Sequence, residues 1–153
     1  MVKENGRPFN PKVESDHYIH QAVTVGDIET VSEFLDNGGS PNILDSYDCE
    51  PLYTAVKYGK IGIARLLLRA GGDISRKSKF RGTAFGAACW NWNLKMIDFC
   101  LEAGTDINSL ENGYTILDDL MSQKSHIATE SLSEWEAAYN KLVKFGALHA
   151  NKL

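Results

Sequence analysis

Three sets of side chains in this sequence have types and spacings that could support chemistry. His17 and His20 stand three residues apart, so one helical turn would bring both imidazoles to the same side. No carboxylate or thiolate cluster is placed to complete a metal site with them. Cys49 falls in a turn that we expect to be exposed, where incidental thiol reactivity is conceivable, although no base accompanies it. Asp118 and Asp119 are adjacent, so on a helix they point in different directions; a solvated helix end is favoured over an acid–base pair.

Motifs for phosphate binding or nucleophilic catalysis do not occur in the sequence. It contains no Gly-x-Gly-x-x-Gly, no P-loop and no Gly-x-Ser-x-Gly. The glycine pairs follow apolar helical stretches, whereas phosphate is bound at the opposite end of a helix. We therefore expect no catalytic centre, no cofactor and no metal. An enzyme that uses Cys49 or the His17/His20 pair is the remaining, disfavoured alternative.

The stretch from Pro51 to Ile74 shows which elements would position these residues. Pro51 suits the first turn of a short helix, and Gly59 suits its left-handed end. A second helix follows and ends at Gly71 and Gly72. The apolar faces of the two helices are made by Leu52, Ala55 and Val56, and by Ile61, Ala64, Leu67 and Leu68. Neither helix is long enough to be stable alone in water, so this unit needs neighbours.

The same unit recurs along the chain with a fixed period. The glycines that end the second helices are Gly38, Gly71 and Gly104, at spacings of 33 and 33. The residues expected just before the first helices are spaced 33, 33 and 32: His17, Glu50, Thr83 and Thr115. A period of 33 residues with paired helices is typical of ankyrin repeats.

The sequence resembles the ankyrin-repeat family in its motifs as well as its period. The opening Thr-Pro-Leu-His-x-Ala appears in pieces at 18–22, 51–55, 83–88 and 115–117, and the closing Leu-Leu-x-x-Gly-Ala-Asp-x-Asn at 34–42, 67–75 and 100–108. The resemblance covers about residues 17–153. It implies an all-α solenoid of stacked helix-turn-helix units with β-turn or hairpin fingers. It also implies that His20, the surviving motif histidine, is a structural hydrogen-bonding residue. Trp92 departs from the motif, because it stands where the family keeps a mid-repeat glycine.

The domain organisation follows from these landmarks. We expect an N-terminal arm or cap over 1–15 and an ankyrin-repeat domain over 16–153, with repeats at about 16–44, 45–77, 78–109 and 110–153. The interval from Thr115 to Gly146 is 31 residues, against 21 from Thr83 to Gly104. The extra residues around 122–133 are polar. They form a longer loop or longer helices in a terminal cap, or else a binding loop.

We expect the core to include Ile28 in the first repeat and Leu94 in the third, beside other apolar residues of the helix faces. In the last repeat the stripe is Trp135, Tyr139, Leu142 and Val143. Composition agrees with one soluble domain, since 43% of the 153 residues are apolar and no run is long enough for a membrane span. The N-terminus lacks the apolar region of a signal peptide. Three cysteines without paired spacing favour reduced thiols and a cytoplasmic location, with Cys89 and Cys100 acting as small buried hydrophobes.

The family resemblance implies that partners bind on the concave side, at the hairpin tips and the inner helices. Large aromatic residues and arginine most often anchor such interfaces. The predicted partner-binding residues are Tyr47, Lys57, Tyr58, Phe80, Trp90, Asn91, Trp92, Glu111 and Tyr114. Some of these aromatics could instead pack against neighbouring tips, and Trp92 could cover the core.

Charge is segregated along the chain. Nine acids and no Lys or Arg lie between Val13 and Val56, eight bases and one acid between Lys57 and Arg81, and nine acids and one base between Asp98 and Glu136. The acids expected nearest the concave face are Asp16, Asp48, Glu50, Glu111, Asp118 and Asp119. They favour a protein partner with basic patches, and the confinement of the bases to one block argues against nucleic acid.

These observations favour a non-enzymatic protein that binds one partner protein and needs no membrane. Small acidic ankyrin proteins of this kind resemble bacterial immunity or inhibitor proteins, which neutralise a partner by covering it. We expect a monomer when free. An adaptor with several weak partners is the alternative.

Overall fold

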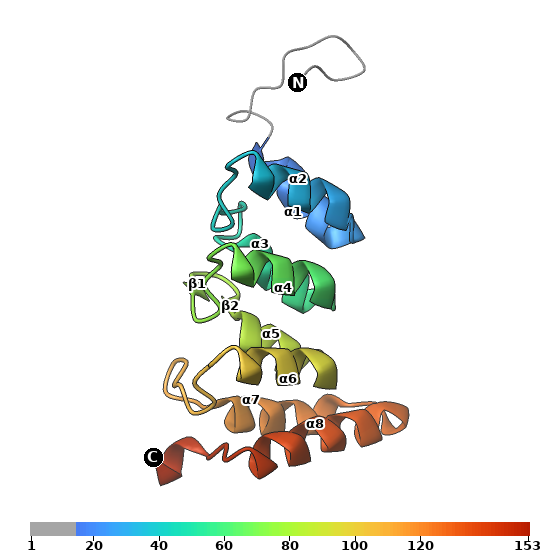
Figure 1. Ribbon diagram of the computed structural model, residues 1–153. Coiled ribbons are helices and arrows are strands. Elements are labelled where there is room, and N and C mark those ends of the chain that lie inside the picture. Colours follow the sequence, from blue (N-terminus) through green and yellow to red (C-terminus); the bar gives the residue numbers. More distant parts are fainter. Residues whose placement is uncertain (1–14) are drawn as a thin grey trace.

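The computed structural model describes residues 15–153. The arm or cap expected over 1–15 lies outside these residues, apart from Ser15 at the start of the first helix. The helices form four consecutive pairs: α1 (Ser15–Val25) with α2 (Ile28–Asp36), α3 (Pro51–Lys57) with α4 (Ile61–Arg69), α5 (Ala84–Trp90) with α6 (Leu94–Glu102), and α7 (Ile116–Gln123) with α8 (Leu132–Lys144). Figure 1 shows these pairs stacked in one column, with the connections between pairs projecting to one side. This confirms the all-α solenoid.

The connections between pairs are the predicted fingers. Finger 1 is residues 43–50, finger 2 is residues 76–83 and finger 3 is residues 109–115. Finger 2 contains an antiparallel hairpin of β1 (Lys77–Ser78) and β2 (Gly82–Thr83), with Lys77 opposite Thr83. In finger 3 a bridge joins Glu111 to Tyr114 around Asn112 and Gly113, whose φ angles are 53° and 86°. Positive φ at both central residues is what a tight hairpin turn requires, as the Asn-Gly pair predicts.

The helix boundaries follow from local chemistry. Pro51 occupies the first turn of α3, and the Thr83 side chain caps α5 by accepting from Gly86 N at 3.0 Å. Gly71 has φ +98°, and the next residue, Gly72, donates its N–H to Leu67 O. This left-handed ending satisfies a carbonyl that the helix leaves open. The prediction that α1 follows His17 is wrong, because the helix begins at Ser15; Ser and Asp suit a first helical turn.

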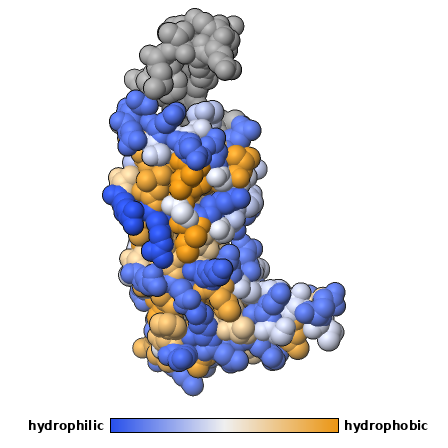
Figure 2. Space-filling model, turned by 45° about the vertical axis from the view of Figure 1, so that its right-hand side comes forward, coloured by the Kyte–Doolittle hydropathy of each residue, from blue (hydrophilic) through white to orange (hydrophobic). Residues whose placement is uncertain are grey.

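The core runs without a break between the pairs, from Ile19 and Val23 in α1 to Leu142 in α8. Four residues predicted to be in it are exposed: Ile28, Ile61, Leu94 and Val143. The first three are the first residues of α2, α4 and α6. Figure 2 shows apolar side chains gathered along the column, bordered by hydrophilic ones.

The extra residues of the last pair form a longer loop and a longer helix. Two short 3-10 helices, Lys124–His126 and Thr129–Ser131, connect α7 to α8, and α8 has 13 residues where α4 and α6 have 9. The end of this pair projects beyond the others in Figure 1.

Asp118 anchors the C-terminal segment to α7. Its Oδ2 atom accepts from Thr115 N, Thr115 Oγ1 and Ala150 N, each at 3.0 Å, and its Oδ1 atom lies 2.7 Å from His149 Nδ1. The Tyr139 hydroxyl lies 3.3 Å from the other ring nitrogen of His149. The hydrogen bond from the Thr115 N–H, followed by the other donors, lowers the pKa of Asp118 well below its usual range. The prediction that Asp118 is simply solvated at a helix end is therefore wrong, since the residues that fold back onto it are 31 and 32 positions away.

The lowered pKa of Asp118 gives a pH dependence with a defined sign. Above about pH 4, the usual pKa of an aspartate, the carboxylate is ionised in both states and its full contribution to stability is present. Below that pH the unfolded chain takes up a proton that the folded chain resists, so the contribution is lost as pH falls. We expect Asp118→Asn to cost about 1 to 2 kcal/mol at pH 7 and less at pH 3.

Urea unfolding of both proteins between pH 7 and pH 3 measures this difference. The wild-type curve should fall more steeply below about pH 4 than that of the variant. Parallel curves would show that Asp118 does not carry the effect.

Candidate binding face

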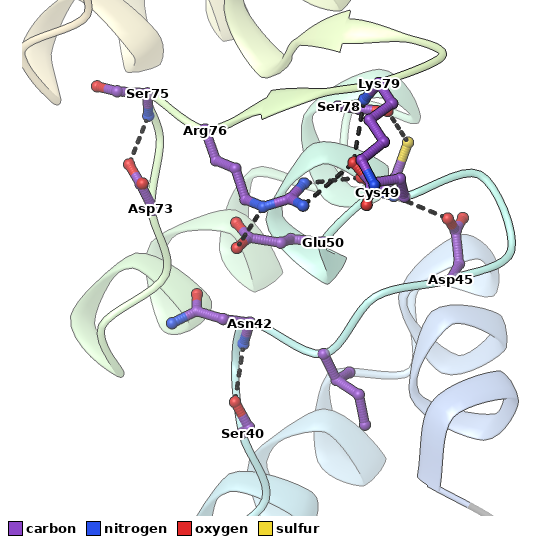
Figure 3. A network of polar contacts seen from close by, with 12 residues as sticks. Ser40, Asn42, Asp45, Cys49, Glu50, Asp73, Ser75, Arg76, Ser78 and Lys79 are labelled. Atoms are coloured by element: carbon purple, nitrogen blue, oxygen red, sulfur yellow. Dashed lines mark hydrogen bonds and ion pairs between the residues drawn. The ribbon is translucent and has the colours of Figure 1, made fainter.

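An ionic network connects fingers 1 and 2 (Figure 3). The Arg76 guanidinium donates to Asp48 O at 2.7 Å and to Asp48 Oδ2 at 3.2 Å, and its Nε atom lies 3.5 Å from Glu50 Oε1. Asp48 Oδ2 also accepts the N–H of Lys79 at 3.0 Å. Glu50 is 5% exposed, and this burial raises its pKa against the opposing effect of Arg76. One arginine thus joins two fingers that are 28 residues apart.

Each finger is also held by its own side chains. In finger 1, Asp45 Oδ1 accepts the N–H groups of Tyr47 and Cys49 at 2.8 and 2.9 Å. In finger 2, Ser78 Oγ accepts from the N–H groups of Phe80 and Arg81 and donates to Tyr47 O at 2.9 Å. Backbone geometry at the two tips therefore does not depend on a bound partner.

Cys49 lies inside this framework and not in an exposed turn, so that prediction is wrong. The residue is 2% exposed, and its Sγ atom lies 3.6 Å from both Tyr47 O and Ser78 Oγ. Burial raises the pKa of its thiol. Cys49 is buried because finger 2 packs over finger 1. The residues next to Cys49 in the sequence give no sign of this contact.

The first groove, of about 620 Å³, lies between the first two helix pairs and finger 1. Its wall includes Tyr47 at the tip and Lys57 and Tyr58 at the end of α3. Tyr47 and Tyr58 are 53% and 49% exposed. Below them His20 is buried, with its ring nitrogens 3.1 Å from Ile43 O and 3.4 Å from Thr54 Oγ1. These contacts confirm that His20 is a structural residue.

The second groove, of about 600 Å³, continues from the first toward α7. It holds six of the predicted partner-binding residues: Lys57, Phe80, Trp90, Asn91, Glu111 and Tyr114. The Asn91 side chain is tied to the preceding pair, because its Nδ2 donates to Lys57 O at 3.0 Å. Gly82 has φ +74°, a left-handed value that favours glycine, and a Cβ atom there would lie 2.9 Å from Glu111 Oε2, so a larger residue would also displace the end of the Glu111 side chain.

The two tryptophans on either side of Asn91 have different environments. Trp90 is 53% exposed and borders the second groove. Trp92 is half-buried, packs against the core and donates Nε1–H to Gln123 Oε1 at 3.1 Å. Its φ of 51° is left-handed, which matches its place at the mid-repeat glycine position. Of the two interpretations left open for Trp92, the structure favours the one in which it covers the core.

Most of the acids expected near the concave face are already engaged. Asp48 and Glu50 contact Arg76, Asp118 holds the C-terminal segment, and Glu111 Oε2 lies 4.0 Å from Lys77 Nζ. The Asp16 side chain lies outside the described residues. Asp119 lines the second groove, and burial, followed by the nearby acids Glu111 and Asp118, raises its pKa. Fewer acids are therefore available to a basic partner than the sequence suggests, mainly Asp119 and Glu111.

Of the groove residues that were missing from the predicted set, two line both grooves. These are Tyr53 and Arg81, and the Tyr53 hydroxyl donates to Arg81 O at 3.4 Å. The Arg81 guanidinium carbon lies 4.5 Å from the centre of the Tyr47 ring. Tyr53 stands at the histidine position of the family motif, and Arg81 follows Phe80 at a fingertip. Both positions could therefore have been predicted from the sequence to line the grooves.

Other kinds of site are absent from the part of the chain that the structure describes. Among the side chains that the structure describes, from 18 to 153, no three His, Cys, Asp or Glu residues are grouped to hold a metal ion. No helix between 15 and 153 is both long and apolar enough to cross a membrane.

Comparison with known proteins identifies related sequences. A family model of ankyrin repeats, in three copies, matches residues 19–111. The 2-5A-dependent ribonuclease of Mus musculus is 36% identical over 74 residues, which are 48% of this chain and 10% of that protein. An ankyrin repeat protein of fowlpox virus is 31% identical over 119 residues, 76% of this chain and 20% of the relative. The chain thus spans only about a tenth to a fifth of these relatives.

The burial of Cys49 predicts that its thiol is inert in the folded protein. At pH 7.5 iodoacetamide should label Cys49 at least about tenfold more slowly in the folded chain than in urea, because the thiol is covered and its pKa is raised. Mass spectrometry of the peptide that contains Cys49 gives both rates. Equal labelling, or faster labelling when folded, would contradict the placement and revive a thiol-dependent enzyme.

Proposed function

We propose, because the chain belongs to the ankyrin-repeat family, that it is a binding protein whose concave face takes a segment of one partner protein. Ankyrin repeats are generally protein–protein interaction modules, and the family is generally non-enzymatic. The proposal extends this general role to the two grooves of this chain.

The row of exposed aromatics along the grooves carries the proposal. Tyr47, Tyr58, Phe80, Trp90 and Tyr114 are between 49% and 68% exposed, and they come from three fingers and two inner helices. Rings left this open on rigid elements lose little conformational freedom when a partner covers them.

The rigidity of the fingers supports the same proposal. Hydrogen bonds within and between fingers 1 and 2 hold Tyr47 and Arg81 before any partner arrives. A preorganised surface spends less of its binding energy on ordering, so affinity per contact is higher. One tightly bound partner fits this surface better than many weak ones.

The narrower proposal is that binding inhibits the partner by covering it, as in the immunity and inhibitor proteins that the sequence resembles. An adaptor role is the alternative, and a single partner captured with nanomolar Kd distinguishes the two. The chain would act without catalysis and, given its free cysteines, in the cytoplasm. Basic groups on the partner are proposed only opposite Glu111 and Asp119.

Substitutions at the groove rim test the proposed binding face. With the protein captured from cell extract by the immobilised chain, Trp90→Ala and Tyr58→Ala should each weaken binding by about 2 kcal/mol, or roughly 30-fold. Lys95→Ala on α6, an exposed residue that lines neither groove, is the matched control and should leave Kd unchanged. Calorimetric titration provides the three values. Unchanged affinity in both aromatic variants would remove the concave-face proposal.

A further inference from the structure

Two cations of the grooves have no acidic partner among residues 18–153, whose side chains the structure describes. Lys57 and Arg81 line both grooves, and neither has a carboxylate oxygen of those residues within 4.0 Å. Other bases, such as Arg76 and Lys141, do have one. Asp45, which also lines the first groove, is not available to them in full, because its Oδ1 atom holds two N–H groups of finger 1.

Both cations are positioned by aromatic rings. Arg81 lies over the Tyr47 ring at 4.5 Å, and Lys57 Nζ lies 5.1 Å from the centre of the Tyr58 ring. The backbone beneath them is fixed as well, since Lys57 O accepts from Asn91 and Arg81 O accepts from Tyr53. These side chains therefore present positive charge at a defined place on an apolar surface.

One helix pair further along the stack, the same groove has the opposite charge. Asp119 of α7 is half-buried and has no cation within 4.0 Å among the described residues. Glu111 at finger 3 lies beside it in the wall of the groove, with Lys77 as a distant partner. Desolvation of the Asp119 carboxylate is unfavourable for its charged form, and a bound cation would offset that cost.

We propose that the groove binds an extended protein segment that carries both charges: an Asp or Glu side chain over Lys57 and Arg81, and a Lys or Arg side chain toward Glu111 and Asp119. An apolar side chain between them packs against Phe80, Trp90 and Tyr114. This inference rests on the proposed function. It adds the chemistry of the bound segment and says which end of the groove takes its acid and which takes its base.

Charge complementarity excludes simpler partners. A uniformly basic segment would be repelled at Lys57 and Arg81, and a polyanion such as nucleic acid would be repelled at Asp119. If the same segment bound the other way round, its base would lie against Lys57 and Arg81 and its acid against Glu111 and Asp119, so like charges would meet at both ends. The groove therefore specifies orientation by repulsion as well as attraction.

Selection from a displayed library of random dodecapeptides tests the proposal. The full chain is immobilised as wild type, as Lys57→Glu with Arg81→Glu, and as Asp119→Lys. Peptides enriched on the wild type should carry an acid and a base at a fixed separation around an aromatic or aliphatic residue. The double variant should select a base in place of the acid, and Asp119→Lys an acid in place of the base.

Binding of one enriched peptide and its charge-swapped counterparts completes the test. The peptide should bind the double variant at least about tenfold more weakly, and exchanging its acid for a base should restore affinity. Lys95→Glu is the control for a change of surface charge outside the grooves. Thermal unfolding of each variant confirms folding. The milder Lys57→Ala with Arg81→Ala replaces the double reversal if that variant does not fold, and Asp119→Asn replaces Asp119→Lys.

Three outcomes would overturn the proposal: no enrichment, enrichment of one sign of charge only, or the same peptides on wild type and variants. If Trp90→Ala and Tyr58→Ala weaken binding of the captured protein as expected while the charge reversals do not affect peptide selection, the proposed function stands and this inference fails. If neither set of variants affects binding, both fail.

Discussion

The contact on which the binding face depends is the one between Arg76 and the two acids of finger 1. In a solenoid each unit touches only its neighbours, so the fingers have no common core to align them. The Arg76 guanidinium supplies that alignment by bonding to Asp48 and approaching the buried Glu50. Because Glu50 is almost fully covered, its charge would be costly without this cation nearby. The network therefore fixes the register of fingers 1 and 2.

That register determines which charges remain for a partner. Arg76 is occupied by Asp48 and Glu50, whereas Arg81, five residues further along the same finger, lies over Tyr47 and has no carboxylate oxygen of the described side chains within 4.0 Å. Ser78, between them, turns the chain by accepting two N–H groups. The same finger thus holds one arginine in a structural ion pair, Arg76, and one arginine that lines both grooves, Arg81.

The sequence predicted what local rules control. The period of 33, the glycines at helix ends, the Thr83 cap and the Asn112-Gly113 turn depend on neighbouring residues, and the structure confirms each. Cys49 and Asp118 were misplaced because their surroundings come from segments 29 and 31 residues away. The sequence indicated the aromatic residues of the candidate site. It could not distinguish Arg81 from the other bases between Lys57 and Arg81, because only the structure shows which of those bases are in ion pairs.

Amide hydrogen exchange in Arg76→Gln tests most directly whether this arginine aligns the fingers. The account predicts that the amides of Cys49, Lys79 and Arg81 exchange at least about tenfold faster than in the wild type, a local loss of about 1.4 kcal/mol, while those within α3 and α5 keep their protection. Lys95→Gln serves as the control. Unchanged exchange in the fingers, or an equal increase throughout the helices, would contradict the central role of Arg76.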